Sequence, residues 1–192
     1  MIISKDNFLP ESSFKELNLH MLSRFHPDRR YDNEIFTSGV NPLLDGCPIR
    51  MRSVSIDGNL MEPACHLGRM IPEVTEAMRS YLITDLNLKD PLPYHFWFQY
   101  HGLHHNTGPH HDGAVRDNPL DRSISTLLYT HATWEEDWGG ELCTHGTELL
   151  TKPNRIVTYS RDEEHWVNSI KHGDPDYQRM FFGVSWSFYG FN

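Results

Sequence analysis

The stretch YHFWFQY, residues 94–100, marks the point at which the hydrophobic pattern of the sequence changes. Before it, apolar residues recur every three or four positions, as they do in amphipathic helices. From it onward, short runs of aromatic and β-branched residues are separated by turn clusters such as NTGP, WGG and KPN. This change of period predicts a helical first part, residues 1–93, and a β-rich core, residues 94–192.

The β-rich part contains a series of strand-like runs with no helical segment between them. The runs are YHFWFQY, SISTLLYT, RIVTYS, HWVNSI and RMFFGVSWSFY. Such a series predicts an antiparallel sandwich or barrel. Trp186 and the phenylalanines of the last run are expected to belong to its core.

Two segments of the first part carry helical patterns. Residues 13–25 have an apolar stripe at helical spacing, and residues 72–82 have another, with Pro72 in the first turn. Each helix is therefore expected to pack one face inward. Residues 1–4 are expected to form a short strand, and residues 26–50, rich in Pro, Asp, Asn and Gly, a long connection.

The composition is that of a globular chain, because 38% of the 192 residues are apolar, which suffices for one domain spanning residues 1–192. The formal net charge of −9 argues against a nucleic-acid partner, since binding to a polyanion requires a basic face.

No signal peptide or membrane-spanning run is recognisable, so we expect a cytoplasmic protein. Cys47, Cys65 and Cys143 are far apart and are expected to be reduced thiols. The oligomeric state cannot be inferred from the sequence.

A histidine-rich stretch, HGLHHNTGPHHDG, occupies residues 101–113 of the β series. Because side chains alternate along a strand, His110 and Asp112 share one face and His111 points to the other. One imidazole and one carboxylate on a face, completed by a distant histidine, form a 2-His-1-carboxylate site for Fe(II). That ligand set leaves positions open for a co-substrate and for dioxygen.

Two other H-x-D triplets begin at His26 and His172, but neither opens the β series. The third ligand is expected from a later strand. The candidates are His131, His145, His165 and His172. His165 is favoured because it begins the run HWVNSI, whereas His131 and His172 fall in expected turns and His145 follows no clear strand.

Arg179 opens the last strand-like run, downstream of His165. A guanidinium deep in a pocket is suited to a planar carboxylate, which it can bind through two parallel hydrogen bonds. The sequence therefore pairs a candidate metal site with a candidate carboxylate site.

Together these residues resemble the Fe(II)/2-oxoglutarate-dependent dioxygenases, and within them the prolyl 4-hydroxylase-like branch. The family pattern is a tyrosine before H-x-D, a strand ending in tyrosine, GGEL, a distal histidine, a glycine turn and a basic residue opening the last strand. The matching residues here are Tyr100, His110, Asp112, Tyr129, Gly139, Gly140, Glu141, Leu142, His165, Gly173 and Arg179. The match is close over residues 94–188 and loose over the first 25, whereas residues 26–93 match nothing.

The resemblance implies a mainly β fold with a double-stranded β-helix (jelly-roll) core flanked by N-terminal helices. It assigns residues 1–93 to helical support and substrate-side connections. It also implies that His110, Asp112 and His165 bind Fe(II).

The resemblance further implies 2-oxoglutarate as co-substrate, with ascorbate as an optional reductant. Arg179 and Tyr129 would hold the far carboxylate of 2-oxoglutarate, and Tyr100 would approach the same molecule. The implied reaction hydroxylates an unactivated C–H bond and releases succinate and CO2. A prolyl residue of a peptide or protein is the family-level substrate, and a free amino acid or another small molecule is the alternative.

Other interpretations stay open. Jelly rolls also include cupin-type metal proteins without oxygenase chemistry and binding domains without catalysis, although the open triad and Arg179 favour the oxygenase. WGGEL is expected to be architectural, and the acidic runs 135–137 and 162–164 are expected to be solvated turns. The remaining histidines of the histidine-rich stretch are expected to be loop residues near the pocket mouth, namely His101, His104, His105 and His111.

Overall fold

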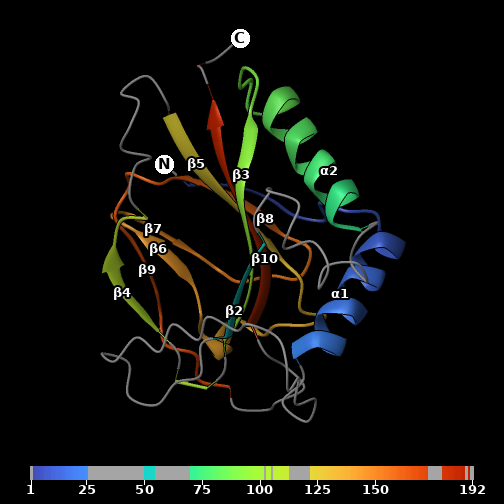
Figure 1. Cartoon of the computed structure of the whole chain (residues 1–192). Coiled ribbons are helices and arrows are strands. Elements are labelled where there is room, and N and C mark those ends of the chain that lie inside the picture. The colour runs from blue at the N-terminus through green and yellow to red at the C-terminus, as the bar shows by residue number, and fades with distance from the viewer. Residues whose placement is uncertain are drawn as a thin grey trace.

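The computed structural model describes most of the chain. The described residues are 2–25, 50–54, 70–101, 103–104, 106–112, 122–172, 179–188 and 190. Within them, two antiparallel sheets lie against each other, and two helices cover the outer face of the larger sheet (Figure 1).

The elements follow one another in the order predicted, helices mainly first and strands after. They are β1 (Ile2–Lys5), α1 (Glu11–Phe25), β2 (Arg50–Val54), α2 (Met70–Thr84), β3 (Leu92–His101), β4 (Thr107–His110), β5 (Arg122–Tyr129), the 3-10 helix η1 (Glu136–Trp138), β6 (Leu142–Thr144), β7 (Thr147–Leu149), β8 (Ile156–Ser160), β9 (His165–Val167) and β10 (Arg179–Phe188). The larger sheet has the order β1-β8-β5-β10-β3-β2, and the smaller one β4-β9-β6-β7. This mainly β architecture confirms the predicted fold class.

Each strand-like run of the sequence forms a strand, and both predicted helices are present. Four strands were not among the predicted runs, and the strand assumed for His110 and Asp112 is misplaced, because β4 ends at His110 and leaves His111 and Asp112 just beyond it. β2 lies in the part expected to hold helices and connections, and β4 contains Gly108 and Pro109, which are turn residues by composition. β6 and β7 have three residues each, too few to show a period. The rest of the expected connection, residues 26–49, lies outside the described residues.

Side-chain alternation in the larger sheet divides the core into two layers. The outer layer lies between this sheet and the helices and is made mainly of Leu17, Met21, Met78, Leu82, Ile124, Leu128, Phe182, Val184 and Trp186. The inner layer lies between the two sheets and contains Leu127, Tyr129, Leu142, Val157, Tyr159, Val167 and Phe181. Alternate residues of β5, β8 and β10 therefore point into the space between the sheets. Trp186 and the phenylalanines of β10 are buried, as predicted.

The N-terminal segment is joined to the turn before β8 by polar contacts over a large sequence separation. The Asn154 side chain accepts a hydrogen bond from Leu9 N at 2.9 Å and donates one to Leu9 O at 2.8 Å, and both groups are buried. Next to it, the guanidinium of Arg155 pairs with both carboxylate oxygens of Asp6. These contacts hold the segment between β1, which is an edge strand of the larger sheet, and α1 against the turn before β8.

Neither helix in the described part of the chain is long and apolar enough to cross a membrane. Cys143 is buried and forms no disulfide. Burial, together with the charges of Glu148 and Glu141, raises the pKa of its thiol to about 11, so the unreactive thiol predominates at neutral pH. Cys47 and Cys65 lie outside the described residues.

We expect Asn154→Ala to destabilise the fold by about 2 kcal/mol, because two buried backbone groups of Leu9 lose their partner. The matched control is Asn7→Ala. Asn7 and Asn154 both have a positive φ, 51° and 54°, but Asn7 is exposed. Urea unfolding of the two variants measures the difference, and equal losses would contradict the role of the Asn154 side chain.

Candidate active site

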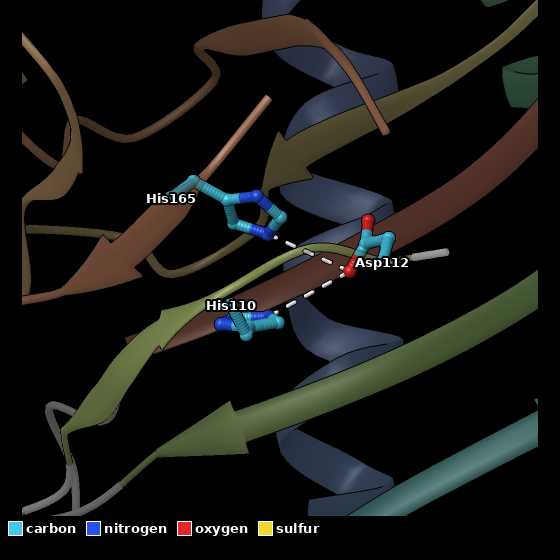
Figure 2. A group of neighbouring side chains, drawn as sticks. All are labelled: His110, Asp112 and His165. Carbon is cyan, nitrogen blue, oxygen red and sulfur yellow. Dashed lines mark ion pairs between the residues drawn. The ribbon is translucent and has the colours of Figure 1, made fainter. Parts of the chain in front are cut away.

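Three side chains that could bind a metal converge where β4 and β9 meet (Figure 2). His110 ends β4 and His165 begins β9, and the two residues are paired in the antiparallel register. The Nε2 atoms of His110 and His165 lie 3.7 and 3.5 Å from the same oxygen, Oδ1 of Asp112. One donor atom from each of the three residues lies within 4.8 Å of the others. The structure thus brings together the residues predicted as metal ligands.

Backbone carbonyls hold both imidazoles in the orientation that a metal requires. Nδ1 of His110 lies 2.9 Å from the Gly108 carbonyl oxygen, and Nδ1 of His165 lies 2.9 Å from that of Glu163. Because a carbonyl oxygen only accepts, each Nδ1 carries the proton. The Nε2 lone pairs are therefore directed toward Asp112 and are available to a metal.

Hydroxyl groups bind the other oxygen of the Asp112 carboxylate. Oδ2 accepts hydrogen bonds from the Ser125 hydroxyl at 3.0 Å and the Tyr159 hydroxyl at 3.2 Å. Ser125 and Tyr159 are opposite each other on β5 and β8. Arg161 donates to the backbone oxygen of Asp112 at 2.7 Å. Oδ1, which faces both imidazoles, is thereby left to a metal.

The environment keeps Asp112 ionised. Burial alone would raise the pKa of Asp112, but hydrogen bonding to His165 when that imidazole is protonated, the charges of that imidazolium and of Arg161, and the Ser125 hydroxyl outweigh burial and lower the pKa to about 2. Burial and, next, the Asp112 charge raise the pKa of Tyr159 well above its ordinary value, so that its hydroxyl stays a donor. Two neutral imidazole nitrogens and one carboxylate oxygen form a donor set that suits Fe(II).

The triad is buried on one side and open on the other. The side chain of His165 is only 3% exposed, whereas that of His110 is 39% exposed. A molecule from solvent can therefore approach the three donor atoms from the side of β4.

A second polar site is built around Arg179, the first residue of β10, which is completely buried. Its Nε donates to the Gly140 carbonyl at 2.9 Å, and one terminal nitrogen donates to Nδ1 of His101 at 2.9 Å. The other terminal nitrogen donates to the Tyr129 hydroxyl at 3.0 Å. Among the described residues no carboxylate forms an ion pair with Arg179.

Such a buried cation is costly unless it finds an opposite charge. A guanidinium has five N–H donors, and these contacts leave one on each terminal nitrogen of Arg179 without a partner among the described residues. Two such donors suit a carboxylate. The surroundings of Arg179 therefore fit the anionic end of a small acid.

Gly140 is required by the position of Arg179. Gly140 has φ +77°, and a Cβ atom there would lie 2.9 Å from Cδ of Arg179. No larger residue fits while the Gly140 carbonyl accepts from Nε. The sequence WGGEL is therefore architectural, as expected, with Glu141 buried before β6. Residues 135–137 of the first acidic run are exposed, also as expected.

Two histidines were placed wrongly from the sequence. His101 was expected in a loop near the pocket mouth, but it is the last residue of β3, is 2% exposed and lies opposite Arg179 in the sheet. His131 was expected in a turn, but it is buried directly after β5 against the backbone of Met180. For His101 the available signal was its position at the end of YHFWFQY, since a strand can extend by one residue.

The remaining tyrosines and histidines that were singled out from the sequence lie as follows. Tyr129 lies beside Arg179, whereas the side chain of Tyr100 lies outside the described residues. His111 is exposed and its Nδ1 contacts the Asp162 carbonyl, away from the triad. His104 is exposed in a turn, and His105 lies outside the described residues.

Comparisons with known proteins agree with this geometry. The family model of the 2OG-Fe(II) oxygenase superfamily matches residues 96–186. Among curated proteins, no sequence relative was found.

The fold matches a prolyl-4-hydroxylase from Pseudomonas putida with TM-score 0.61 and 17% identity, covering 97% of this chain and 91% of the other. It also matches a viral collagen prolyl hydroxylase from Paramecium Bursaria Chlorella virus-1 with TM-score 0.65 and 13% identity, covering 97% and 96%. A third match is HygX from Streptomyces hygroscopicus, solved with nickel and 2-oxoglutarate, with TM-score 0.62 and 6% identity, covering 96% and 82%. These structural likenesses confirm the double-stranded β-helix fold.

We expect Tyr159→Phe to lower the affinity for a divalent metal about tenfold, because Oδ2 of Asp112 loses one of its two hydroxyl donors. Competition between Co(II) and a chelator measures the affinity, and urea unfolding of the metal-free variant checks that the fold is retained. An unchanged Co(II) affinity would show that the Tyr159 hydroxyl does not orient the carboxylate.

His131 makes stability depend on pH. Burial lowers the pKa of His131 from 6.5 to about 3, the Met180 carbonyl partly opposes this, and the Arg179 charge adds to it. Between pH 3 and 6.5 the unfolded chain therefore binds one more proton than the folded chain. The contribution of neutral His131 to stability is fully present above about pH 6.5 and is lost as the pH falls toward 3. The loss is about 1.4 kcal/mol per pH unit. We expect His131→Asn, which cannot titrate, to weaken this slope in urea unfolding with EDTA present, and identical slopes would contradict the assignment.

Proposed function

This chain belongs to the 2OG-Fe(II) oxygenase superfamily, and from that premise we propose that it hydroxylates an unactivated C–H bond of a prolyl residue in a peptide or protein. Enzymes of this superfamily use Fe(II) and 2-oxoglutarate. Succinate and CO2 are the co-products of the proposed reaction. The observation that carries the proposal is a triad able to hold a metal, together with a buried Arg179 that no carboxylate of the described residues neutralises, inside the same pair of sheets.

We propose that His110, Asp112 and His165 hold the iron. Bound Fe(II) would supply the activation of dioxygen that oxidative decarboxylation of 2-oxoglutarate and C–H hydroxylation require. The protein contributes orientation. The Gly108 and Glu163 carbonyls direct the two imidazoles, and three protein donors leave other coordination positions open.

Arg179 and Tyr129 are proposed to hold the far carboxylate of 2-oxoglutarate. Their contact of 3.0 Å leaves guanidinium donors available. Both residues point into the space between the sheets, as does Ser125, which contacts Asp112. Ser125 and Tyr129 are four residues apart on β5, which is about 13 Å along a strand. The inner face of β5 therefore runs from the triad to Arg179, and a short dicarboxylic acid bound at the metal would extend along this face toward the Arg179 side chain.

The prolyl substrate is proposed from the structural neighbours and from the access that solvent molecules have to the triad. Several structural neighbours are named as prolyl hydroxylases, among them a Trichoplax adhaerens prolyl hydroxylase in complex with a hypoxia inducible factor peptide fragment. The exposed side of His110 gives a peptide access to the triad. A free amino acid or another small molecule is the alternative substrate.

We expect His165→Ala to abolish 2-oxoglutarate turnover, because it removes the buried ligand of the triad. Succinate formation in the presence of Fe(II), 2-oxoglutarate and ascorbate measures turnover, and anaerobic addition of 2-oxoglutarate to the Fe(II) protein should give a weak visible charge-transfer band. The control is His145→Ala, since His145 is a largely exposed histidine that pairs with Glu164 outside the triad. Succinate formation that survives in His165→Ala, with no band in the wild type, would refute the oxygenase proposal.

The substrate is tested by stimulation of this turnover. Proline-containing peptides are compared with free amino acids at equal concentration, and hydroxylated products are identified by mass spectrometry. A mass increase of one oxygen on a prolyl residue supports the proposed substrate. Stimulation by a free amino acid alone would favour the alternative.

A further inference from the structure

We infer that His101 is a positioning residue for the co-substrate site: it orients the Arg179 guanidinium so that the remaining N–H donors meet the far carboxylate of 2-oxoglutarate. The inference rests on the proposed function, since it assigns a third protein group to the same carboxylate site. His101 was not among the co-substrate residues predicted from the sequence.

The contact between the two residues defines the protonation state of His101. The terminal nitrogen of Arg179 lies 2.9 Å from Nδ1 of His101, and both side chains are buried. A guanidinium only donates, so Nδ1 of His101 must carry the lone pair. His101 is therefore a neutral imidazole protonated on Nε2.

A neutral acceptor suits this position better than a carboxylate. An aspartate or glutamate beside Arg179 would neutralise the guanidinium and compete with the anionic co-substrate. The imidazole nitrogen accepts the hydrogen bond without compensating the positive charge of Arg179. The Tyr129 hydroxyl and the Gly140 carbonyl, which are also uncharged, bind the other two nitrogens of the guanidinium.

His101 is itself held in place. It pairs with Arg179 in the register between β3 and β10. Its ring meets that of Phe181 edge to face, with centroids 5.6 Å apart. The Phe181 ring also lies 5.2 Å from the Arg179 Cζ atom. The guanidinium thus lies beside the Phe181 ring and donates to the His101 ring, so His101 is one of the three groups that orient it.

Without that acceptor, one buried donor of Arg179 loses its partner. A buried donor left unsatisfied costs free energy, so the guanidinium turns to recover a hydrogen bond. The donors that face the co-substrate carboxylate then move away from it. This movement should weaken the binding of ligands that carry the far carboxylate and leave the binding of ligands that lack it unchanged.

The test uses two 2-oxo acids and two variants. 2-Oxoglutarate has the far carboxylate, whereas 2-oxopentanoate has the same chain length with a methyl group in its place. His101→Leu removes the acceptor, and His101→Asn keeps one near the position of Nδ1. Isothermal titration of the Mn(II)-loaded proteins gives the Kd of each ligand, and 2-oxoglutarate turnover gives KM and kcat.

For His101→Leu we expect a Kd for 2-oxoglutarate about tenfold higher, an unchanged Kd for 2-oxopentanoate, and a raised KM with kcat largely retained. His101→Asn should recover most of the 2-oxoglutarate affinity. Equal weakening of both ligands, no weakening of either, or failure of His101→Asn to recover would overturn the inference while leaving the oxygenase intact. Wild-type protein that binds no 2-oxoglutarate would instead refute the proposed function, and the inference with it.

Discussion

Alternation of side chains along β8, β5 and β10 is the constraint on which the rest of this structure depends. One set of residues packs on the helices and includes Leu128 and Trp186, while the intervening set faces the smaller sheet. The inner set includes Ser125, Tyr159 and Arg179, which form both polar sites. A shift of one residue in the pairing would exchange the two faces. The core and the candidate site are therefore specified by the same register.

The two polar sites hold opposite charges by the same means. The Asp112 carboxylate is bound by hydroxyl groups, and the Arg179 guanidinium by a carbonyl, a hydroxyl and an imidazole. These partners satisfy hydrogen bonds without neutralising either charge. Leu127 and Val157 lie opposite each other between the two sites and keep that stretch apolar. Each charge stays available to a ligand, one to a metal cation and the other to a carboxylate.

The parts of the fold that were predicted correctly carry a sequence pattern that is complete within a short segment of the chain. The helix stripes and the runs that became β5, β8 and β10 are of this kind, and so is the H-x-D triplet. The missed strands lack such a pattern. β4 forms because Thr107 and His110 pair with β9, although its own residues favour a turn. His101 was misplaced because its burial comes from Arg179, which is 78 positions away in the sequence.

The sequence by itself determined the kinds of groups in the site. His110, Asp112, His165 and Arg179 could be chosen from the H-x-D spacing and from their places beside strand-like runs, because both are local properties of the chain, although β4 ends at His110 and Asp112 lies just beyond it. Only the tertiary structure decided which atoms of these groups remain free. The hydroxyls on Oδ2 of Asp112 and the imidazole on Arg179 come from other strands, and antiparallel register brings them there. Register depends on the packing of whole sheets, so it cannot be read from any one segment.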